Sequence, residues 1–170
     1  MDLDVEALKF EFPDGWQATR YDDWSFYRNQ FSAIRPGLKG VDLLAISPDE
    51  ATLWFVEVKD YRQHRRTKPI SLDLEVAEKV VSTSAALLPA RVNANDDAEE
   101  DFARQALGAS IRQLRVVLHL EQPARHSKFF PRAIDRADVQ VKLRRRVKAI
   151  DPHALVVESS AMGPLPWTVK

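Results

Sequence analysis

Three side chains near the middle of the chain have the types and spacing to do chemistry together: Asp42, Glu57 and Lys59. Asp42 opens one short apolar run, and Glu57 and Lys59 stand at the end of the next. Because side chains alternate across a strand, Glu57 and Lys59 project to the same face. Two carboxylates are oxygen ligands of the kind that Mg²⁺ prefers, and the main-chain carbonyl of Val58 adds a third oxygen. The pattern predicts a divalent-metal site with a lysine beside it.

Two adjacent strands must position these side chains. The apolar runs at residues 40–46 and 53–59 are joined by Ser47-Pro48-Asp49-Glu50, which is typical of a tight connection between neighbouring strands. Asp42 then supplies a second acid on the strand next to the one that ends in Glu57 and Lys59. The predicted metal site therefore depends on this strand pair.

Strands and helices alternate in the rest of the chain. Strands are predicted at residues 3–12, 32–35, 116–120 and 155–157, a basic loop at 60–69, and helices at about 22–31, 96–114 and 134–150. A further apolar helix is predicted from Ser71 or Asp73 to about Leu88, where Pro89 should end it. Late strands that alternate with helices imply a partly parallel sheet with helices on its faces. We therefore expect an α/β fold, in a single domain over residues 1–170.

Composition narrows the class of protein. The chain has 170 residues, of which 45% are hydrophobic and 29% charged, as in an ordinary globular domain. The absence of cysteine excludes disulfides and thiolate metal sites. With 25 acidic and 25 basic residues the net charge is zero, which argues against a protein that coats nucleic acid through its overall field. With no signal peptide evident and no apolar run long enough to cross a bilayer, we expect a cytoplasmic protein without membrane contact.

Cations gather locally in spite of the neutral total. Arg62, Arg65 and Arg66 follow directly after Lys59, where they would lie beside the predicted site and contact the phosphates of a substrate. An ordinary solvated loop accounts for them equally well. A second basic run, from Lys142 to Lys148, is better explained as the exposed face of a helix with its cations near the carboxyl end.

Asp42, fourteen intervening residues and then Glu57-Val58-Lys59 resemble the motif of the PD-(D/E)xK, or restriction-endonuclease-like, nuclease superfamily. Gly40-Val41-Asp42 departs from a literal Pro-Asp, as family members often do. The resemblance covers roughly residues 21–120. It implies a mixed central sheet flanked by helices and metal-dependent hydrolysis of phosphodiester bonds in DNA, with RNA as the alternative. Asp42 and Glu57 would hold Mg²⁺ or Mn²⁺, and Lys59 would be the catalytic lysine.

The same resemblance raises questions about further residues. Many family members place an acid in the first helix, for which Asp22 and Asp23 are candidates and Glu11 is a weaker one; an N-cap or a solvated helix start explains Asp23 better. On the helix after the motif, Glu78 and Lys79 fall where some members carry auxiliary polar residues, facing either the site or solvent. A homodimer or larger complex is expected by family analogy, since a small domain grips a duplex poorly alone.

Other interpretations remain open. A nuclease fold that no longer cuts would serve as a nucleic-acid-binding or protein-interaction module. Alternatively the motif is a coincidence, and Glu57 and Lys59 merely end a strand in solvent. The aromatic residues Tyr21, Trp24 and Phe31 are predicted to pack in the core. Four histidines show no metal-ligand spacing: His64, His119, His126 and His153. Of these, His119 is predicted to be a hydrogen-bonded core residue.

Overall fold

The computed structural model describes residues 1–48, 51–123, 125, 129 and 133–170, so that Asp49, Glu50 and His126 lie outside the described residues. Its centre is a five-stranded sheet in the order β3-β4-β5-β6-β7. The strands are β3 (Gln17–Arg20), β4 (Leu43–Ser47), β5 (Thr52–Asp60), β6 (Gln113–Glu121) and β7 (Leu155–Val157). The β3–β4 and β4–β5 pairs are antiparallel, and the β5–β6 and β6–β7 pairs are parallel. The sheet is therefore mixed, as alternating strands and helices predict.

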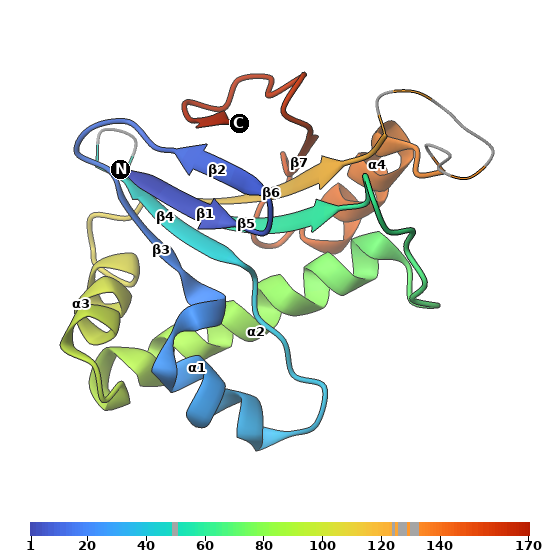
Figure 1. Ribbon diagram of the computed structural model, residues 1–170. Coiled ribbons are helices and arrows are strands. Elements are labelled where there is room, and N and C mark those ends of the chain that lie inside the picture. Colours follow the sequence, from blue (N-terminus) through green and yellow to red (C-terminus); the bar gives the residue numbers. More distant parts are fainter. Residues whose placement is uncertain (49–50, 124, 126–128, 130–132) are drawn as a thin grey trace.

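A second sheet covers one face of the first (Figure 1). It is formed by β1 (Asp2–Val5), β2 (Leu8–Glu11) and β8 (Thr168–Val169), all antiparallel, so the two chain ends lie in one layer. Its side chains share a core with alternate residues of the central strands, among them Leu43, Trp54 and Val58.

The helices cover the other face (Figure 1). They are α1 (Ser25–Asn29), α2 (Leu72–Asn93), α3 (Asp97–Ala106) and α4 (Arg136–Arg146), and the 3₁₀ turns Tyr21–Asp23 and Phe31–Ile34 flank α1. The core beneath them takes the remaining alternate residues of the strands, such as Leu44 and Phe55. Tyr21, Trp24 and Phe31 are buried in this core, which confirms the prediction for the aromatic residues. None of the described helices combines the length and hydrophobicity that crossing a bilayer requires.

Several predicted elements are wrong. Residues 3–12 form a hairpin rather than one strand, because Glu6 takes a left-handed φ of 54° at the turn. Residues 32–35 lie mostly in a 3₁₀ turn instead of a strand, and the edge strand β3 was missed. The predicted helix at 96–114 stops at Ala106, since residues from Gln113 onward pair with β5. Backbone pairing with a neighbouring strand outweighs local propensity in these segments.

Helix α2 continues through Pro89 to Asn93, although the sequence analysis expected Pro89 to end it. Proline removes one backbone donor and leaves the carbonyl of Ala85 without its usual helical partner. Ala85 lies on the exposed side of α2, where water can satisfy that carbonyl. Buried neighbours such as Ala86, Leu87 and Ala90 hold the helix against the core beyond the proline. Tertiary packing therefore overrides the local stop signal.

Candidate active site at the ends of β4 and β5

The antiparallel pairing of β4 and β5 brings Asp42 and Glu57 together. The register pairs Leu43 with Val56, and one further step sets Asp42 opposite Glu57. Asp42 Oδ2 accepts a hydrogen bond from the backbone N–H of Val58 at 2.6 Å, which holds the carboxylate against β5. Two acids on neighbouring strands thus lie side by side where β4 begins and β5 ends.

Lys59 lies on the same face of β5 as Glu57. That face also carries Phe55 and points toward the helices, whereas Val58 points toward the second sheet. Glu57 is fully buried, and Lys59 Nζ donates hydrogen bonds to Glu57 Oε1 and, at 3.2 Å, to the carbonyl of Val58. The alternation expected from the sequence is present, and it places the lysine directly on the buried carboxylate.

A second lysine enters the site from α2. Lys79 Nζ donates to Glu57 Oε1 at 2.5 Å and lies 3.5 Å from Asp42 Oδ1, with a side chain that is 10% exposed. The sequence analysis left the direction of Lys79 open; the structure turns it toward the site and leaves Glu78 exposed. Helical phase carried the signal, because Lys79 follows the buried Val76 by three residues. We call Asp42, Glu57, Lys59 and Lys79 the carboxylate–lysine cluster.

Burial dominates the electrostatics of this cluster. It raises the pKa of the Glu57 carboxyl to about 7; the charge of Asp42 adds to this effect, and Lys79 and Lys59 oppose it. Burial alone would lower the pKa of Lys59, but the carboxylates of Glu57 and Asp42 outweigh it and raise that pKa above its ordinary value. The lysine therefore stays protonated at neutral pH, whereas the Glu57 carboxyl is only partly ionised there.

The donor set fits one small divalent cation. Glu57 Oε2 is buried and has no hydrogen-bond partner among the described residues, which leaves a carboxylate oxygen for a ligand. Asp42 and the carbonyl of Val58 supply further hard oxygens, as Mg²⁺ requires. In the part of the chain that the structure describes, no group of three or more histidine and carboxylate side chains could hold a metal ion. Water and substrate would have to complete the coordination of a metal here.

Glu75 on α2 pairs with basic side chains of the loop that follows β5. Arg66 Nη1 donates to Glu75 Oε2 at 2.6 Å, Lys68 Nζ donates to Oε1 at 2.5 Å, and Lys59 Nζ lies 4.0 Å from Oε1. Burial would raise the pKa of Glu75, but the hydrogen bonds from Lys68 and Arg66 outweigh it and lower that pKa to about 2. Arg66, expected from the sequence to contact phosphate, is only 14% exposed and holds the loop to α2.

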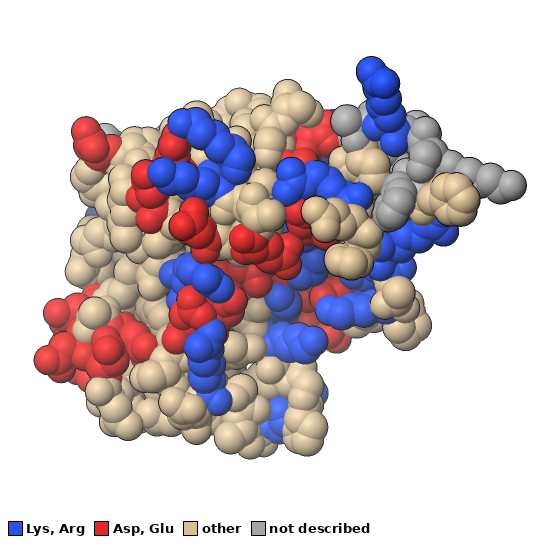
Figure 2. Space-filling model, viewed as in Figure 1, with Lys and Arg blue, Asp and Glu red and all other residues tan. Residues whose placement is uncertain are grey.

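Arg62 and Arg65 keep more of their side chains in solvent. Arg62 is 40% exposed and pairs with Asp60 at 2.6 Å, and the exposed Arg65 donates from Nε to the carbonyl of Phe129 at 2.7 Å. In Figure 2, basic side chains gather toward α4 and the loop after β5, whereas acidic side chains gather toward α3. The neutral net charge therefore conceals a separation of charge across the molecule.

The candidate first-helix acids lie in different surroundings. Asp23 is exposed just before α1 and pairs with Arg20 at 3.0 Å and with Arg28; Trp24 is the N-cap of α1, so the solvated position holds and the N-cap role is wrong. Glu11 lies on β2 and accepts from Lys170 at 2.8 Å, within the second sheet. Asp22 differs from both, because its Oδ1 is buried without a partner among the described residues. Burial raises the pKa of Asp22, and the charge of Asp42 adds to the effect.

The β1–β2 turn contributes an acid that the sequence analysis missed. Glu6 stands at this turn, next to Val5 and close in sequence to Leu8, which both pack against the central sheet. Burial raises the pKa of Glu6, the charges of Lys59 and Lys79 oppose the shift, and that of Asp42 adds to it. Glu6 is exposed, and the folding of the hairpin onto the sheet brings its carboxyl within electrostatic range of the cluster.

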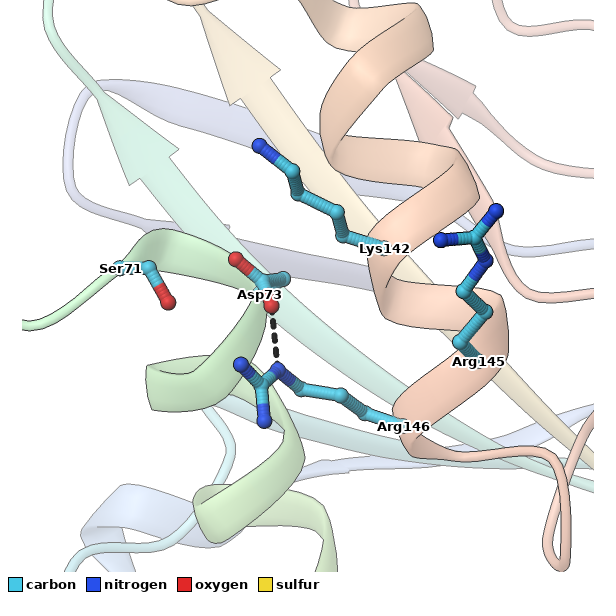
Figure 3. A pocket seen from close by; sticks show the side chains of 5 residues that line it. All are labelled: Ser71, Asp73, Lys142, Arg145 and Arg146. Carbon is cyan, nitrogen blue, oxygen red and sulfur yellow. Dashed lines mark hydrogen bonds and ion pairs between the residues drawn. The ribbon is translucent and has the colours of Figure 1, made fainter.

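A basic cavity of about 550 Å³ lies between the start of α2 and α4 (Figure 3). Its lining residues are Ser71, Asp73, Lys142, Arg145 and Arg146. Lys142 and Arg146 extend from α4 toward α2, and Arg146 Nε donates to Asp73 Oδ2. The basic run of α4 is exposed, as predicted, but part of it also lines this cavity. Asp73 precedes Lys79 by six residues, which is about 9 Å along a helix.

The three histidines that the structure describes take no part in this site. His119 is fully buried, and its Nε2 lies 2.9 Å from Glu121 Oε1, which confirms the predicted hydrogen-bonded core position. His64 and His153 are exposed.

Comparisons with known proteins give one partial match. The chain is 30% identical over 164 residues to a cysteine–tRNA ligase of Neisseria meningitidis serogroup A / serotype 4A (strain DSM 15465 / Z2491). The match covers 79% of this chain and 23% of the ligase, so the chain spans about a quarter of that protein's length. No family model and no solved structure matches the chain.

Proposed function

We propose that this protein is a nuclease of restriction-endonuclease-like fold that hydrolyses phosphodiester bonds with Mg²⁺ or Mn²⁺. The observation that carries the proposal is the convergence of Asp42, Glu57 and Lys59 on one face at the edge of the sheet. The topology supports the proposed fold, because β5 lies antiparallel to β4 and parallel to β6, and α2 makes part of the crossover between β5 and β6.

Each residue has a defined part in this proposal. Asp42, Glu57 and the carbonyl of Val58 would hold the metal, which supplies an activated water and neutralises charge on the phosphoryl oxygens when it is bound. Lys59 stays protonated, so its ammonium can donate a hydrogen bond to the attacking water or to a phosphoryl oxygen as negative charge develops there. Glu57 orients Lys59 through Oε1, while its unpartnered Oε2 remains available.

The proposed substrate is nucleic acid, with DNA as the first choice. Arg62 and Arg65 lie on the loop that follows Lys59 and present guanidinium groups to solvent, where they would hold backbone phosphates. The partial match to a protein whose name includes tRNA makes RNA the second substrate to test. A homodimer would lengthen the surface available to a duplex, and sedimentation analysis of the free protein measures that state directly.

The metal site is tested by titration of the purified protein with MnCl₂. We expect Mn²⁺ to raise the melting temperature by several degrees, because an ion that binds only the folded state stabilises it. The affinity should be higher at pH 8 than at pH 6, since the Glu57 carboxyl, with a pKa of about 7, must lose its proton to bind metal. Asp42→Asn should abolish the response. An unchanged Mn²⁺-induced shift in Asp42→Asn would contradict the proposed ligand set.

The phosphate contacts are tested by a double substitution, Arg62→Ala with Arg65→Ala. In Ca²⁺, which allows binding to be measured without rapid turnover, we expect affinity for a short DNA duplex to fall about tenfold at low salt. The slope of log affinity against log salt should decrease by about one to two, as each lost phosphate contact reduces it by nearly one. Arg91→Ala on the exposed part of α2 is the matched control. An unaltered salt slope would remove both arginines from the interface.

A second candidate function is a binding module that no longer cuts. One observation favours it: Lys79 pairs with both acids of the pair, where a divalent cation would bind. Such a module would bind the duplex in the salt-dependent way described above, yet give no stabilisation by Mn²⁺ and no cleavage products from DNA or RNA.

A further inference from the structure

The acidic pair of the carboxylate–lysine cluster already holds a positive charge where a divalent cation would bind. Lys79 Nζ lies 2.5 Å from Glu57 Oε1 and 3.5 Å from Asp42 Oδ1, so one ammonium bridges both proposed metal ligands. Its side chain is 10% exposed and that of Glu57 is buried, which keeps water from screening the contact. The ammonium of Lys79 thus lies between the carboxylates of Asp42 and Glu57, as a metal ion would.

The charges of the cluster balance without a metal. Asp42 and Glu57 carry two negative charges when ionised, and Lys59 and Lys79 carry two positive ones. If both lysines stayed in place, a bound divalent cation would leave the buried cluster with an excess of two positive charges. Such an excess is strongly unfavourable in a poorly solvated site. Metal binding therefore requires one of the two lysine side chains to move away from the carboxylates.

Of the two lysines, Lys79 is the one whose side chain can move away from the carboxylates. Lys59 also bonds Glu57 Oε1, but it has a partner outside the acidic pair, Glu75 Oε1 at 4.0 Å, besides the carbonyl of Val58 at 3.2 Å. Among the described residues, Lys79 bonds and pairs with Glu57 and Asp42. Beside it is a small cavity of about 50 Å³, lined by Glu75 and the exposed Glu78 as well as by Arg35 and Lys39.

We propose that Lys79 is an internal counter-cation. In the metal-free protein its ammonium is bound between Asp42 and Glu57, where it competes with the divalent cation for these carboxylates. The inference rests on the proposed metal-dependent nuclease function and adds a control on metal affinity to it. In this role Lys79 acts through the metal ligands and is a positioning residue. The protein would take up Mg²⁺ or Mn²⁺ only when the ammonium moves aside into the neighbouring cavity.

The test measures Mn²⁺ binding by calorimetry in wild type, Lys79→Gln and Lys79→Arg, without any substrate. Glutamine removes the charge but keeps a donor for Glu57, so the fold should survive. We expect Lys79→Gln to bind Mn²⁺ at least about tenfold more tightly, since an opposing charge a few ångströms away is removed. Lys79→Arg, which keeps the charge, should bind no more tightly than wild type. Lys68→Gln is the matched control, because its ammonium bonds Glu75 instead of the metal ligands.

A second readout comes from melting in EDTA and in excess MnCl₂. Lys79→Gln should melt at a lower temperature than wild type in EDTA, and Mn²⁺ should raise its melting temperature by more than that of wild type. Equal Mn²⁺ affinity in wild type and Lys79→Gln, or weaker affinity in the variant, overturns the role of Lys79 and leaves the metal site standing. If neither protein binds Mn²⁺ by either readout, the proposed metal site is wrong and the role of Lys79 falls with it.

Discussion

Replacement of Lys59 by methionine should lower the rate of Mg²⁺-dependent cleavage by about 10²- to 10⁴-fold, the range associated with a positioned proton donor or charge-stabilising group. Methionine keeps the length and apolar body of the side chain, and Lys59 lies at the end of β5 with its side chain 15% exposed. We therefore expect the fold to persist, with a melting temperature close to that of wild type. Product formation from labelled DNA and RNA, at saturating Mg²⁺, measures the effect.

Two controls separate chemistry from folding in this experiment. Circular dichroism should be the same in both proteins, and Mn²⁺ binding should not weaken, because Lys59 is not a proposed ligand and its charge opposes the cation. Glu57→Gln should lose both cleavage and Mn²⁺ binding. Cleavage by Lys59→Met at the wild-type rate would sink the assignment of Lys59, and the absence of products from wild type on any substrate would favour the binding module.

Replacement of Gly40 by alanine should lower the free energy of unfolding by about 1–3 kcal/mol, the range for overpacking in a filled core. A Cβ at this position would lie 2.3 Å from Cε1 and 2.7 Å from Cδ1 of the Tyr21 ring. The ring has no room to retreat, because it is fully buried and packs against Trp24 and Tyr27 at centroid separations of 5.2 and 5.1 Å. Urea unfolding followed by tryptophan fluorescence measures the loss.

The same substitution should reduce activity through the backbone. The N–H of Tyr21 donates to the carbonyl of Asp42 at 2.9 Å, so a displaced tyrosine also shifts the proposed metal ligand. Gly37→Ala is the matched control: no atom lies within 4 Å of its added Cβ, and only its left-handed φ of 79° opposes the change. We expect about 1 kcal/mol for that strain, with Mn²⁺ binding retained. Equal stability of Gly40→Ala and wild type would show that the close approach to Tyr21 is not tight.

The strand pair at the centre of the fold was predictable because its signals are local. Both runs are apolar and end in charge, so their extended form and the shared face of Glu57 and Lys59 follow from the alternation of side chains alone. The structure has both strands, β4 and β5, within a few residues of the predicted bounds. The late strands and helices were predictable for the same reason, but the ends of α2 and α3 were not, because tertiary contacts set them.

Contacts between distant segments were not predictable. The β1–β2 hairpin brings Glu6 within electrostatic range of the carboxylate–lysine cluster because Val5 and Leu8 pack on the central sheet. The residues around Glu6 in the sequence do not indicate this position. The edge strand β3 is polar and short, so its pairing with β4 leaves little trace in its composition. In the sequence, Arg66 cannot be told apart from the other arginines of its loop. It is mostly buried because its side chain pairs with Glu75, nine residues away on α2.

The sequence by itself determined that Asp42, Glu57 and Lys59 are the residues to examine, because residue type and a two-residue strand period suffice to put a lysine beside a carboxylate. Only the tertiary structure decided that Asp42 reaches Glu57, since that depends on the β4–β5 register. It also decided that Lys79 lies between them, because the phase and docking of a long helix are set by packing over its whole length. Helical phase alone indicates that Lys79 lies on the buried side of α2, but not which side chains it contacts there.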